Sequence, residues 1–485
     1  MGFHNGNPQA LDARLLKDRI LSLVEEYYQA AHRKPAFVPG QSRVPYAGRV
    51  YDAREMTLLT DSALDFWLTA GPYADRFERR MRQFFGSRDF LLVNSGSSAN
   101  LVMLSTLCAS ALAKDLAEGS LPPLVAGDEV ITPAVTFPTT VAPIVQNRLV
   151  PVFVDCEVGT YNINPRLIED AIGPRTRAIF VPHTVGNPCD MEIIGEVARR
   201  RGLWLLEDGC DALGATFNGQ LAGTFGDMSS LSFYPAHHIT MGEGGGVAIN
   251  SFGLQKTARS IRDWGRDCWC DPGKSNTCGS RFGWQAGQLP CGYDHKYIYS
   301  NIGYNLKVTD LQAAIGLAQT EKMEDFIAAR RRNFQSLYQG LQAHEEHLIL
   351  PTTDPRANPS PFAFPITVRP GLERNRLIGH LEDAQIETRL VFGGNIIRQP
   401  GFLDIEKRIH GDLAASDTIM RDTFFIGVYP GLTEEMIGYV LETFRNFFRA
   451  SRSPATEIQR AASVVKLAAA PEAQCRPARG QVTLS

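Results

Sequence analysis

Side chains that could bind or react gather in three short segments, each directly after an apolar run. The first, NSGSSANL, places Gly96, Ser97 and Ser98 between an apolar run and a helical pattern. Glycine lets a ligand approach the backbone, and hydroxyls and amides at a helix N-terminus form a cradle for a phosphate group. Many turns of this composition bind nothing, so the segment becomes informative only together with the other two.

The second segment, LWLLEDGCDALGA, places Glu207 and Asp208 at the end of an apolar run. A carboxylate there can keep the ring nitrogen of a pyridoxal-type cofactor protonated, which makes the ring an electron sink. The structural alternative is a carboxylate that caps the following turn. The residues themselves leave both interpretations open.

The third segment, LSFYPAHHITMGEGGG, contains the adjacent histidines His237 and His238. Neighbouring side chains of an extended segment point to opposite sides, so we expect only one of the two to face a given site. The structural alternative is a loop with one surface histidine and one packed histidine.

Four of the nine cysteines have the spacing C-x57-C-x-C-x7-C, formed by Cys210, Cys268, Cys270 and Cys278. An odd cysteine count in a long chain argues against a disulfide framework and favours metal binding or free thiols. Four thiolates suit an iron–sulfur cluster, but tetrahedral zinc accepts them equally well. No role is assigned to Cys108, Cys156, Cys189, Cys291 or Cys475.

A repeated alternation of apolar runs and helical patterns begins near residue 88. The runs are FLLVN, DEVIT, LVPVFVD, AIFVPHT and LWLLED. This order predicts an α/β fold with a mainly parallel central sheet flanked by helices. Ligands bind such sheets outside the carboxyl ends of the strands, which is where the reactive segments stand.

The predicted organisation has four parts. They are an N-terminal helical segment over 1–40, a large cofactor-binding domain over 41–345 with a cysteine-bearing loop over 265–295, a smaller C-terminal α/β domain over 346–450, and a tail over 451–485. The tail is rich in Ala, Arg, Ser and Pro, and we expect it to be disordered.

Bulk properties exclude several classes of partner. The chain has 485 residues, 44% apolar and 21% charged, with a formal net charge of -3, which is ordinary for a globular protein. Without a basic excess, neither nucleic acid nor an anionic membrane surface is an expected partner. No apolar run reaches the roughly 18 residues of a membrane span, and the first residues lack the pattern of a secretory signal. We therefore expect a cytoplasmic protein.

The motifs NSGSSAN, EDGCDALG, SFYPAHHITMGEGGG and YNLKVTDLQAAIG, in this order, resemble the DegT/DnrJ/EryC1/StrS family of nucleotide-sugar aminotransferases over about residues 40–450. The resemblance implies a type I pyridoxal-phosphate-dependent aminotransferase fold, a nucleotide-linked 4-keto sugar as substrate, and a homodimer with sites at its interface. It implies roles for seven residues at the cofactor: Gly96, Ser97, Ser98 and Ser232 at the phosphate, Asp208 at the ring nitrogen, Phe137 stacked on the ring, and Asn305 reaching the neighbouring subunit's phosphate.

One departure from the family pattern is decisive. His237 stands where ordinary members carry the lysine that forms a Schiff base with the cofactor, and histidine cannot form that imine. The subgroup that keeps this histidine motif acts on CDP-4-keto-6-deoxy-D-glucose in 3,6-dideoxysugar biosynthesis of the lipopolysaccharide type. That resemblance implies that pyridoxamine 5′-phosphate stays bound as the amine. It also implies a [2Fe–2S] cluster on the four spaced cysteines and a separate NAD(P)H-dependent flavin and iron–sulfur reductase.

The implied reaction is removal of the C3 hydroxyl of the sugar, with His237 moving a proton at the cofactor. A histidine with an ordinary pKa of about 6.5 is partly neutral near pH 7, whereas a free lysine near 10.4 is not. Tyr234 would help to protonate the departing hydroxyl, or would only pack.

Three alternatives remain. A 3-dehydratase acting on a TDP-4-keto-2,6-dideoxyhexose would share the histidine and can share the cluster. A sugar aminotransferase would need the lysine that position 237 lacks. A non-catalytic regulatory module stabilised by zinc would bind metal without sulfide.

Overall fold

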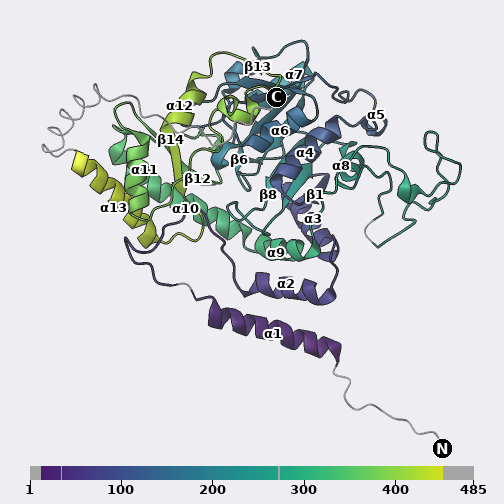
Figure 1. Cartoon of the computed structure of the whole chain (residues 1–485), viewed down its shortest axis with the longest axis horizontal. Helices are drawn as coiled ribbons and strands as arrows, with labels where there is room; N and C mark the ends of the chain where they lie inside the picture. The colour runs from purple at the N-terminus through teal and green to yellow at the C-terminus, as the bar shows by residue number, and fades with distance from the viewer. Residues whose placement is uncertain (1–11, 34, 271–272, 452–485) are drawn as a thin grey trace, which may run out of the picture.

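An eight-stranded sheet forms the centre of the computed structural model, which describes residues 12–33, 35–270 and 273–451 (Figure 1). The strand order is β1-β9-β8-β5-β4-β2-β3-β13. Strand β9 runs antiparallel to both of its neighbours, and all other neighbours are parallel. The strands are β1 (Asp89–Val93), β2 (Glu129–Pro133), β3 (Val150–Val154), β4 (Thr176–Pro182), β5 (Trp204–Asp208), β8 (Met228–Ser232), β9 (Gly245–Ile249) and β13 (Arg408–Ile409). The expected α/β fold with a mainly parallel sheet is confirmed.

Helices connect the strands and cover the sheet. They are α4 (Gly96–Leu107), the short α5 (Leu112–Asp115), α6 (Pro138–Gln146), α7 (Met191–Arg201) and α8 (Leu254–Arg262). Helix α4 begins where the Ser95 hydroxyl accepts a hydrogen bond from the Ser98 amide, and α6 begins with Pro138 in its first turn. Both helices therefore start directly after the strands that precede them, with their N-termini at the carboxyl edge of the sheet.

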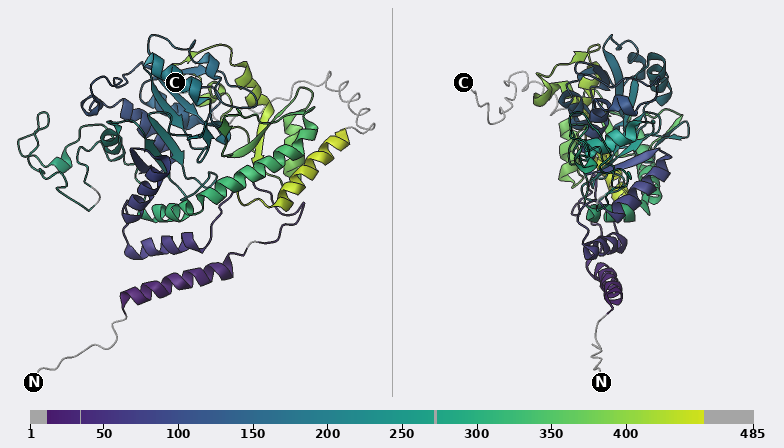
Figure 2. Two further views of the ribbon diagram at one scale, coloured as in Figure 1. Left: turned by 180° about the vertical axis from the view of Figure 1, so that it is seen from behind. Right: turned by 90° about the vertical axis from the view of Figure 1, so that its right-hand side faces the viewer.

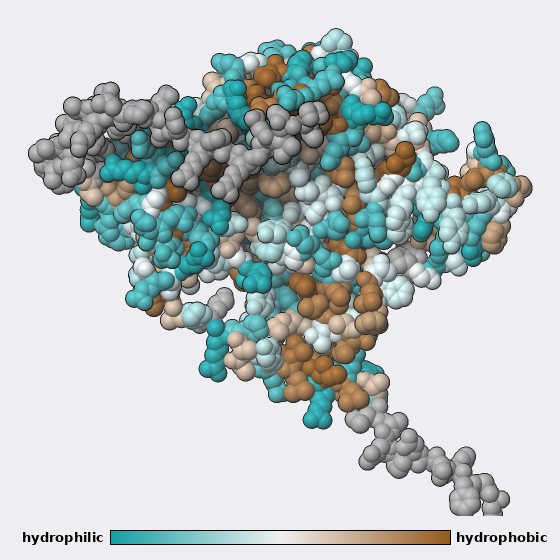
Figure 3. All heavy atoms as spheres, in the orientation of Figure 1, coloured by the Kyte–Doolittle hydropathy of each residue, from teal (hydrophilic) through white to brown (hydrophobic). Residues whose placement is uncertain are grey.

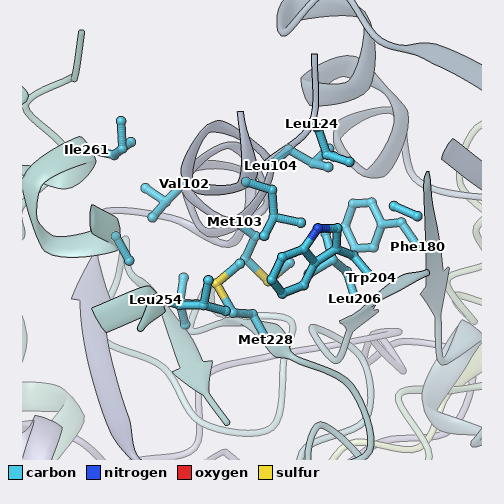
Figure 4. Packing of buried hydrophobic residues seen from close by; sticks show 14 of the residues in the cluster. Val102, Met103, Leu104, Leu124, Phe180, Trp204, Leu206, Met228, Leu254 and Ile261 are labelled. Carbon is cyan, nitrogen blue, oxygen red and sulfur yellow. The ribbon is translucent and has the colours of Figure 1, made fainter. Parts of the chain in front are cut away.

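The core lies on both faces of the sheet, as the continuous apolar runs of parallel strands require. On one face, Met103 of α4 packs among Trp204 and Met228 from the strands (Figure 4). On the other face, Ile194 of α7 packs against Ile179 and its neighbours. Apolar side chains therefore pack on both faces of the sheet and fix the carboxyl ends of its strands.

A group of helices lies at the β1 side of the sheet. It comprises α1 (Ala13–Ala31), α2 (Ala53–Asp65), α3 (Pro72–Phe85) and α9 (Asp310–Thr320). Helix α1 packs against α2 and has no buried residue, so it lies on the outside of the molecule (Figures 1 and 2). Hydrophobic residues gather on the surface over α1 and α2 (Figure 3).

The C-terminal segment builds a second, antiparallel sheet of order β10-β12-β14. Its elements are α10 (Met323–Leu341), β10 (Leu348–Ile349), β12 (Ala363–Val368), α11 (Arg374–Asp383), α12 (Ala414–Asp422), β14 (Thr423–Gly427) and α13 (Glu434–Ser451). The same segment also returns β13 to the large sheet, where Arg408 Nη2 donates to Glu129 Oε2 over 2.8 Å. The two parts of the chain are therefore interleaved rather than joined by one linker.

A third, small sheet has the order β11-β6-β7, with β6 (Thr216–Phe217), β7 (Gln220–Leu221) and β11 (Ala357–Asn358). Within the described residues, no helix combines the length and apolarity needed to cross a bilayer. The expected disorder of the tail stays a prediction, because residues 452–485 lie outside the described ones.

Truncating Met103 to alanine should destabilise the protein by about 2–5 kcal/mol, because the deletion leaves a cavity in a dry core. Denaturant unfolding monitored by circular dichroism measures the change. The control is Leu403→Ala, since Leu403 is 54% exposed and its truncation should cost much less. Equal costs for the two variants would contradict the packing described here.

Candidate active site

The described residues enclose a cavity of about 470 Å³ at the carboxyl ends of β1, β2, β4, β5 and β8. Residues that follow these strands form one wall, and residues of the 346–450 segment form the other. The cavity is therefore where the fold brings the three reactive segments together, and seven of the nine residues expected at the cofactor or in catalysis line it. Those seven are Gly96, Ser97, Phe137, Asp208, Ser232, Tyr234 and His237.

Gly96 and Ser97 form the floor at the start of α4. A Cβ atom on Gly96 would lie 2.7 Å from Ser232 Cβ and 2.9 Å from Cys210 Sγ, so only glycine fits there. The Ser97 hydroxyl donates to Thr139 Oγ1 over 3.0 Å. The adjoining Ser98 hydroxyl instead accepts a hydrogen bond from Ser95 Oγ, and Ser98 is not among the residues that line the cavity. Hydroxyls and a helix N-terminus here offer the cradle that a phosphate group requires.

Asp208 lies at the end of β5, almost fully buried and surrounded by donors. Asn100 Nδ2 and Thr140 Oγ1 each donate to Asp208 Oδ2 over 2.8 Å. The Ser230 hydroxyl donates to the other oxygen over 3.2 Å. These contacts hold the carboxylate in one orientation at the base of the cavity. There it can accept a hydrogen bond from a protonated ring nitrogen.

Glu207, the neighbouring carboxylate, points to the other side of β5. It accepts backbone N–H bonds from Gly223, Phe225 and Gly226 and lies 2.9 Å from His183 Nε2. Glu207 is therefore the carboxylate that caps a turn, which was the structural alternative for Glu207 and Asp208. His183 lines the cavity, and no sequence motif had indicated it.

His237 faces the cavity and His238 does not. His238 is buried, and its Nε2 lies 3.0 Å from the Ser360 carbonyl oxygen. The His237 ring lies 5.1 Å from the Phe362 ring, and its Nδ1 is 3.5 Å from Asp211 Oδ1 without a hydrogen-bond partner. Within the described structure, His237 is therefore a histidine available to a ligand.

Asp211 and Arg330 are functional neighbours of His237 that the sequence motifs did not reveal. Arg330 Nη2 donates to the His237 carbonyl oxygen over 2.8 Å and so holds the histidine turn in place. Burial, together with the positive charge of Arg330, lowers the pKa of His237 to about 4. Burial, together with the nearby Asp208, raises the pKa of Asp211 to about 8. Near pH 7 the pair is therefore neutral, with the proton on the Asp211 carboxyl.

Aromatic residues form the mouth of the cavity. Phe137 and Tyr234 are each 49% exposed, and Phe137 packs edge-on against Phe392 from the other wall. Arg389 also lines this wall, with its guanidinium 4.3 Å from the Tyr46 ring centroid. These rings leave a slot that suits a flat ring system, and the arginine adds a positive charge for an anionic ligand.

Asn305 and three of the four spaced cysteines do not line this cavity. The Asn305 side chain is exposed and accepts a hydrogen bond from Lys307 Nζ over 2.8 Å. Cys210 lies in the cavity wall, whereas Cys268, Cys270 and Cys278 lie on the 263–305 loop that follows α8. Among the described residues, no group of three or more possible ligands is close enough to hold a metal ion. A single described chain thus fits a phosphate-bearing ring cofactor but does not by itself assemble a four-thiolate site.

A family model described as the DegT/DnrJ/EryC1/StrS aminotransferase family matches residues 50–445. The chain belongs to this family. It is 50% identical over 440 residues to the lipopolysaccharide biosynthesis protein RfbH of Salmonella typhimurium, covering 90% of this chain and 99% of that protein. It is also 50% identical over 437 residues to the dTDP-4-dehydro-2,6-dideoxy-D-glucose 3-dehydratase of Saccharopolyspora spinosa, covering 90% and 93%.

A solved structure of Escherichia coli GDP-4-keto-6-deoxy-D-mannose-3-dehydratase with bound hydrated PLP has the same fold. Its TM-score is 0.73 at 28% identity, over 82% of this chain and 98% of that chain. The family and the pyridoxal-phosphate-type fold expected from the motifs are therefore confirmed. Two relatives, from Saccharopolyspora spinosa and Escherichia coli, are named as nucleotide-sugar 3-dehydratases.

Replacing Asp211 with asparagine should change how the stability of the cofactor-free protein depends on pH. The pKa of Asp211 is raised on folding, so its contribution is complete below the unfolded value of about 3.9 and is lost as pH rises toward 8. Between these two pH values, the unfolding free energy of the parent should fall by up to about 1.4 kcal/mol per pH unit relative to that of Asp211→Asn. Denaturant unfolding of both proteins from pH 5 to pH 8 measures this difference, and parallel curves would contradict it.

Proposed function

We propose that this chain is a pyridoxamine 5′-phosphate-dependent enzyme that removes the C3 hydroxyl from a nucleotide-linked 4-keto-6-deoxyhexose. The observation that carries the proposal is that His237 faces the cavity. By the family resemblance, this is the position where aminotransferases have their Schiff-base lysine. The residues of the cavity would hold the amine form of the cofactor, which would supply an electron sink for reaction next to the C4 ketone of the sugar. Without the lysine the chain lacks the group that aminotransferases use to exchange the cofactor between its amine and aldehyde forms.

The residues of the cavity have the chemistry this cofactor needs. Gly96, Ser97 and Ser232 would hold the phosphate, Asp208 would pair with the ring nitrogen, and Phe137 would stack on the ring. The hydroxyl and the backbone amide of Ser98 both bond Ser95 Oγ, so Ser98 would contribute only through the helix N-terminus that it helps to form. The likeness to a dehydratase structure that contains PLP supports this assignment.

His237 would remove a proton from the C4′ carbon of the cofactor while the C3 hydroxyl leaves. Its low pKa keeps it in the neutral form that can accept a proton, and the neighbouring Asp211 can hold the ring in one orientation. Tyr234, at the mouth of the cavity, would donate a proton to the departing hydroxyl.

Loss of the C3 oxygen as water becomes a net deoxygenation only when two electrons and two protons are added. In this proposal Cys210, Cys268, Cys270 and Cys278 would hold a [2Fe–2S] cluster, which would supply those electrons after reduction by a separate NAD(P)H-dependent flavin and iron–sulfur protein. The spacing of the cysteines and the family resemblance support this assignment. A homodimer in the cytoplasm, with Asn305 reaching the neighbouring phosphate, completes the proposal.

The nucleotide named differs between relatives, one being a dTDP-sugar and another a GDP-sugar dehydratase. The motifs favour CDP-4-keto-6-deoxy-D-glucose, as in 3,6-dideoxysugar biosynthesis for lipopolysaccharide O-antigen, while the 50% identity to a dTDP-sugar 3-dehydratase favours a TDP-4-keto-2,6-dideoxyhexose equally. We propose the CDP sugar as substrate and the TDP sugar as the alternative.

Replacing His237 with asparagine should lower kcat by about 10²–10⁴-fold, because a positioned general base contributes an effect of that size. Cofactor binding, followed by absorbance of the bound pyridoxamine phosphate, should persist because the phosphate and ring contacts remain. His237→Lys is the matched probe of the alternative: it should bind pyridoxal phosphate as an imine. An unmodified chain that already transaminates at a steady rate would refute the dehydratase assignment.

An anaerobic assay with pyridoxamine phosphate, a reductase and each nucleotide sugar tests the substrate. Mass spectrometry should show loss of the C3 oxygen, with kcat/KM at least about tenfold higher for the CDP sugar, which is about 1.4 kcal/mol of discrimination. A preference for the TDP sugar would replace the substrate assignment and leave the chemistry intact. Purified protein that carries zinc without acid-labile sulfide and turns over neither sugar would favour the regulatory module.

A further inference from the structure

Arg389 is the one strongly basic side chain among the described residues that line the active-site cavity. It lies in the wall formed by the 346–450 segment, beside Leu390 and Phe392. Its backbone is paired with β14: the Arg389 amide donates to the Phe425 carbonyl oxygen over 3.0 Å, and the Phe425 amide donates back over 2.7 Å. The second sheet therefore determines where this guanidinium reaches the cavity.

The guanidinium of Arg389 is held in place but keeps donors for a ligand. Its Nη1 donates to the Thr388 carbonyl oxygen over 2.7 Å, and its Nη2 lies 3.9 Å from Glu387 Oε2. Glu387 lies closer to Arg43, with Arg43 Nη1 3.3 Å from Glu387 Oε1, so it offsets only part of the Arg389 charge. The guanidinium lies over the Tyr46 ring, and 48% of the side chain is exposed. An arginine in this position presents a planar fork of N–H groups that matches a pair of phosphate oxygens.

The other basic groups at the cavity have protein partners or carry no charge near pH 7. Arg330 donates to four backbone carbonyl oxygens. His237 has a pKa lowered to about 4 by burial and by the charge of Arg330, so it is neutral. Both ring nitrogens of His183 contact protein groups, one of them the carboxylate of Glu207. An anionic ligand that enters the cavity therefore meets its positive charge at Arg389.

The proposed cofactor would leave this charge unused. Its phosphate would lie at Gly96, Ser97 and Ser232, on the floor, where hydroxyls and a helix N-terminus supply the donors. Arg389 belongs to the other wall of the cavity. Glu243 lines the cavity from the turn before β9, on the side of the large sheet, so its negative charge favours the Arg389 wall for a second anion.

The proposed substrate carries its negative charge at a defined place. The C4 ketone has to stand at the cofactor, and the diphosphate is attached at C1, which is the ring atom opposite C4. A sugar whose C4 lies toward the floor therefore directs its diphosphate toward the mouth of the cavity. The exposed rings of Phe137 and Tyr234 lie at this mouth, and Arg389 lines the wall beside it.

We infer that Arg389 binds the diphosphate of the nucleotide-linked sugar and thereby places the C4 ketone at the cofactor. The inference rests on the proposed function and adds which residue recognises the charge of the substrate. The diphosphate is common to CDP and TDP sugars. Arg389 therefore recognises the class of substrate and does not choose between the two nucleotides.

Calorimetric titration of the protein loaded with pyridoxamine phosphate tests the inference, with CDP and dTDP as probes. Arg389→Gln should weaken the binding of both probes by about 10–100-fold, because hydrogen bonds to a charged group contribute an effect of that size. Arg389→Lys should recover part of the affinity, since it keeps the charge but loses the planar fork. Retention of pyridoxamine phosphate, followed by its absorbance, should be the same in the parent and both variants.

The matched control is Arg43→Gln, because Arg43 contacts the same Glu387 but does not line the cavity. Its affinity for both diphosphates should stay close to that of the parent. Unchanged binding in Arg389→Gln, an equal loss in Arg43→Gln, or loss of pyridoxamine phosphate from Arg389→Gln would each overturn the inference. A parent that binds the diphosphates through Arg389 but removes no C3 oxygen would instead refute the proposed function, so the two failures are distinguishable.

Discussion

The active site depends on one buried guanidinium. Arg330, on α10, is almost completely buried, and it donates to four backbone carbonyl oxygens rather than to a carboxylate. Two of these oxygens belong to Ala236 and His237, and two belong to Pro361 and Phe362. Arg330 therefore joins the histidine turn of the large sheet to the opposite wall of the cavity. A hydrogen bond to a charged group contributes about 1.5–3 kcal/mol, so four of them leave the turn little freedom to move.

The same guanidinium determines the chemistry that position 237 can perform. Its positive charge and the low polarity of the surroundings lower the pKa of His237, and burial lowers the pKa of Arg330 itself to about 9. A lysine in this place would also be pushed toward its neutral form, which is the form that makes a Schiff base. A Schiff-base lysine and a neutral histidine therefore both need a pocket that disfavours a positive charge on the side chain. Under the proposed function, exchange of this residue would change the reaction without requiring a new site.

Local patterns predicted the parts of the site that follow directly from a strand. The apolar runs before Gly96 and Asp208 identify buried strands, and the residues after such strands reach the carboxyl edge of the sheet. The alternation of side chains along extended backbone also separates adjacent residues. Glu207 and Asp208 point to opposite sides, and so do His237 and His238. The segment NPRLIEDAI, which follows the apolar run LVPVFVD, has the spacing of a helix but forms only the 3-10 turn η1 (Pro165–Leu167), and Ile168 and Ala171 pack into the core beyond it.

What the sequence could not reveal are contacts between distant segments. Arg330 meets His237 across 93 positions, and Phe362 faces it from yet another element. No local periodicity records such a pairing, because each residue alone is typical of its own helix or strand. The split of the cysteines has the same origin. Their spacing predicts a set of four ligands, but it carries no information on where the fold places Cys210 relative to the loop that holds the other three.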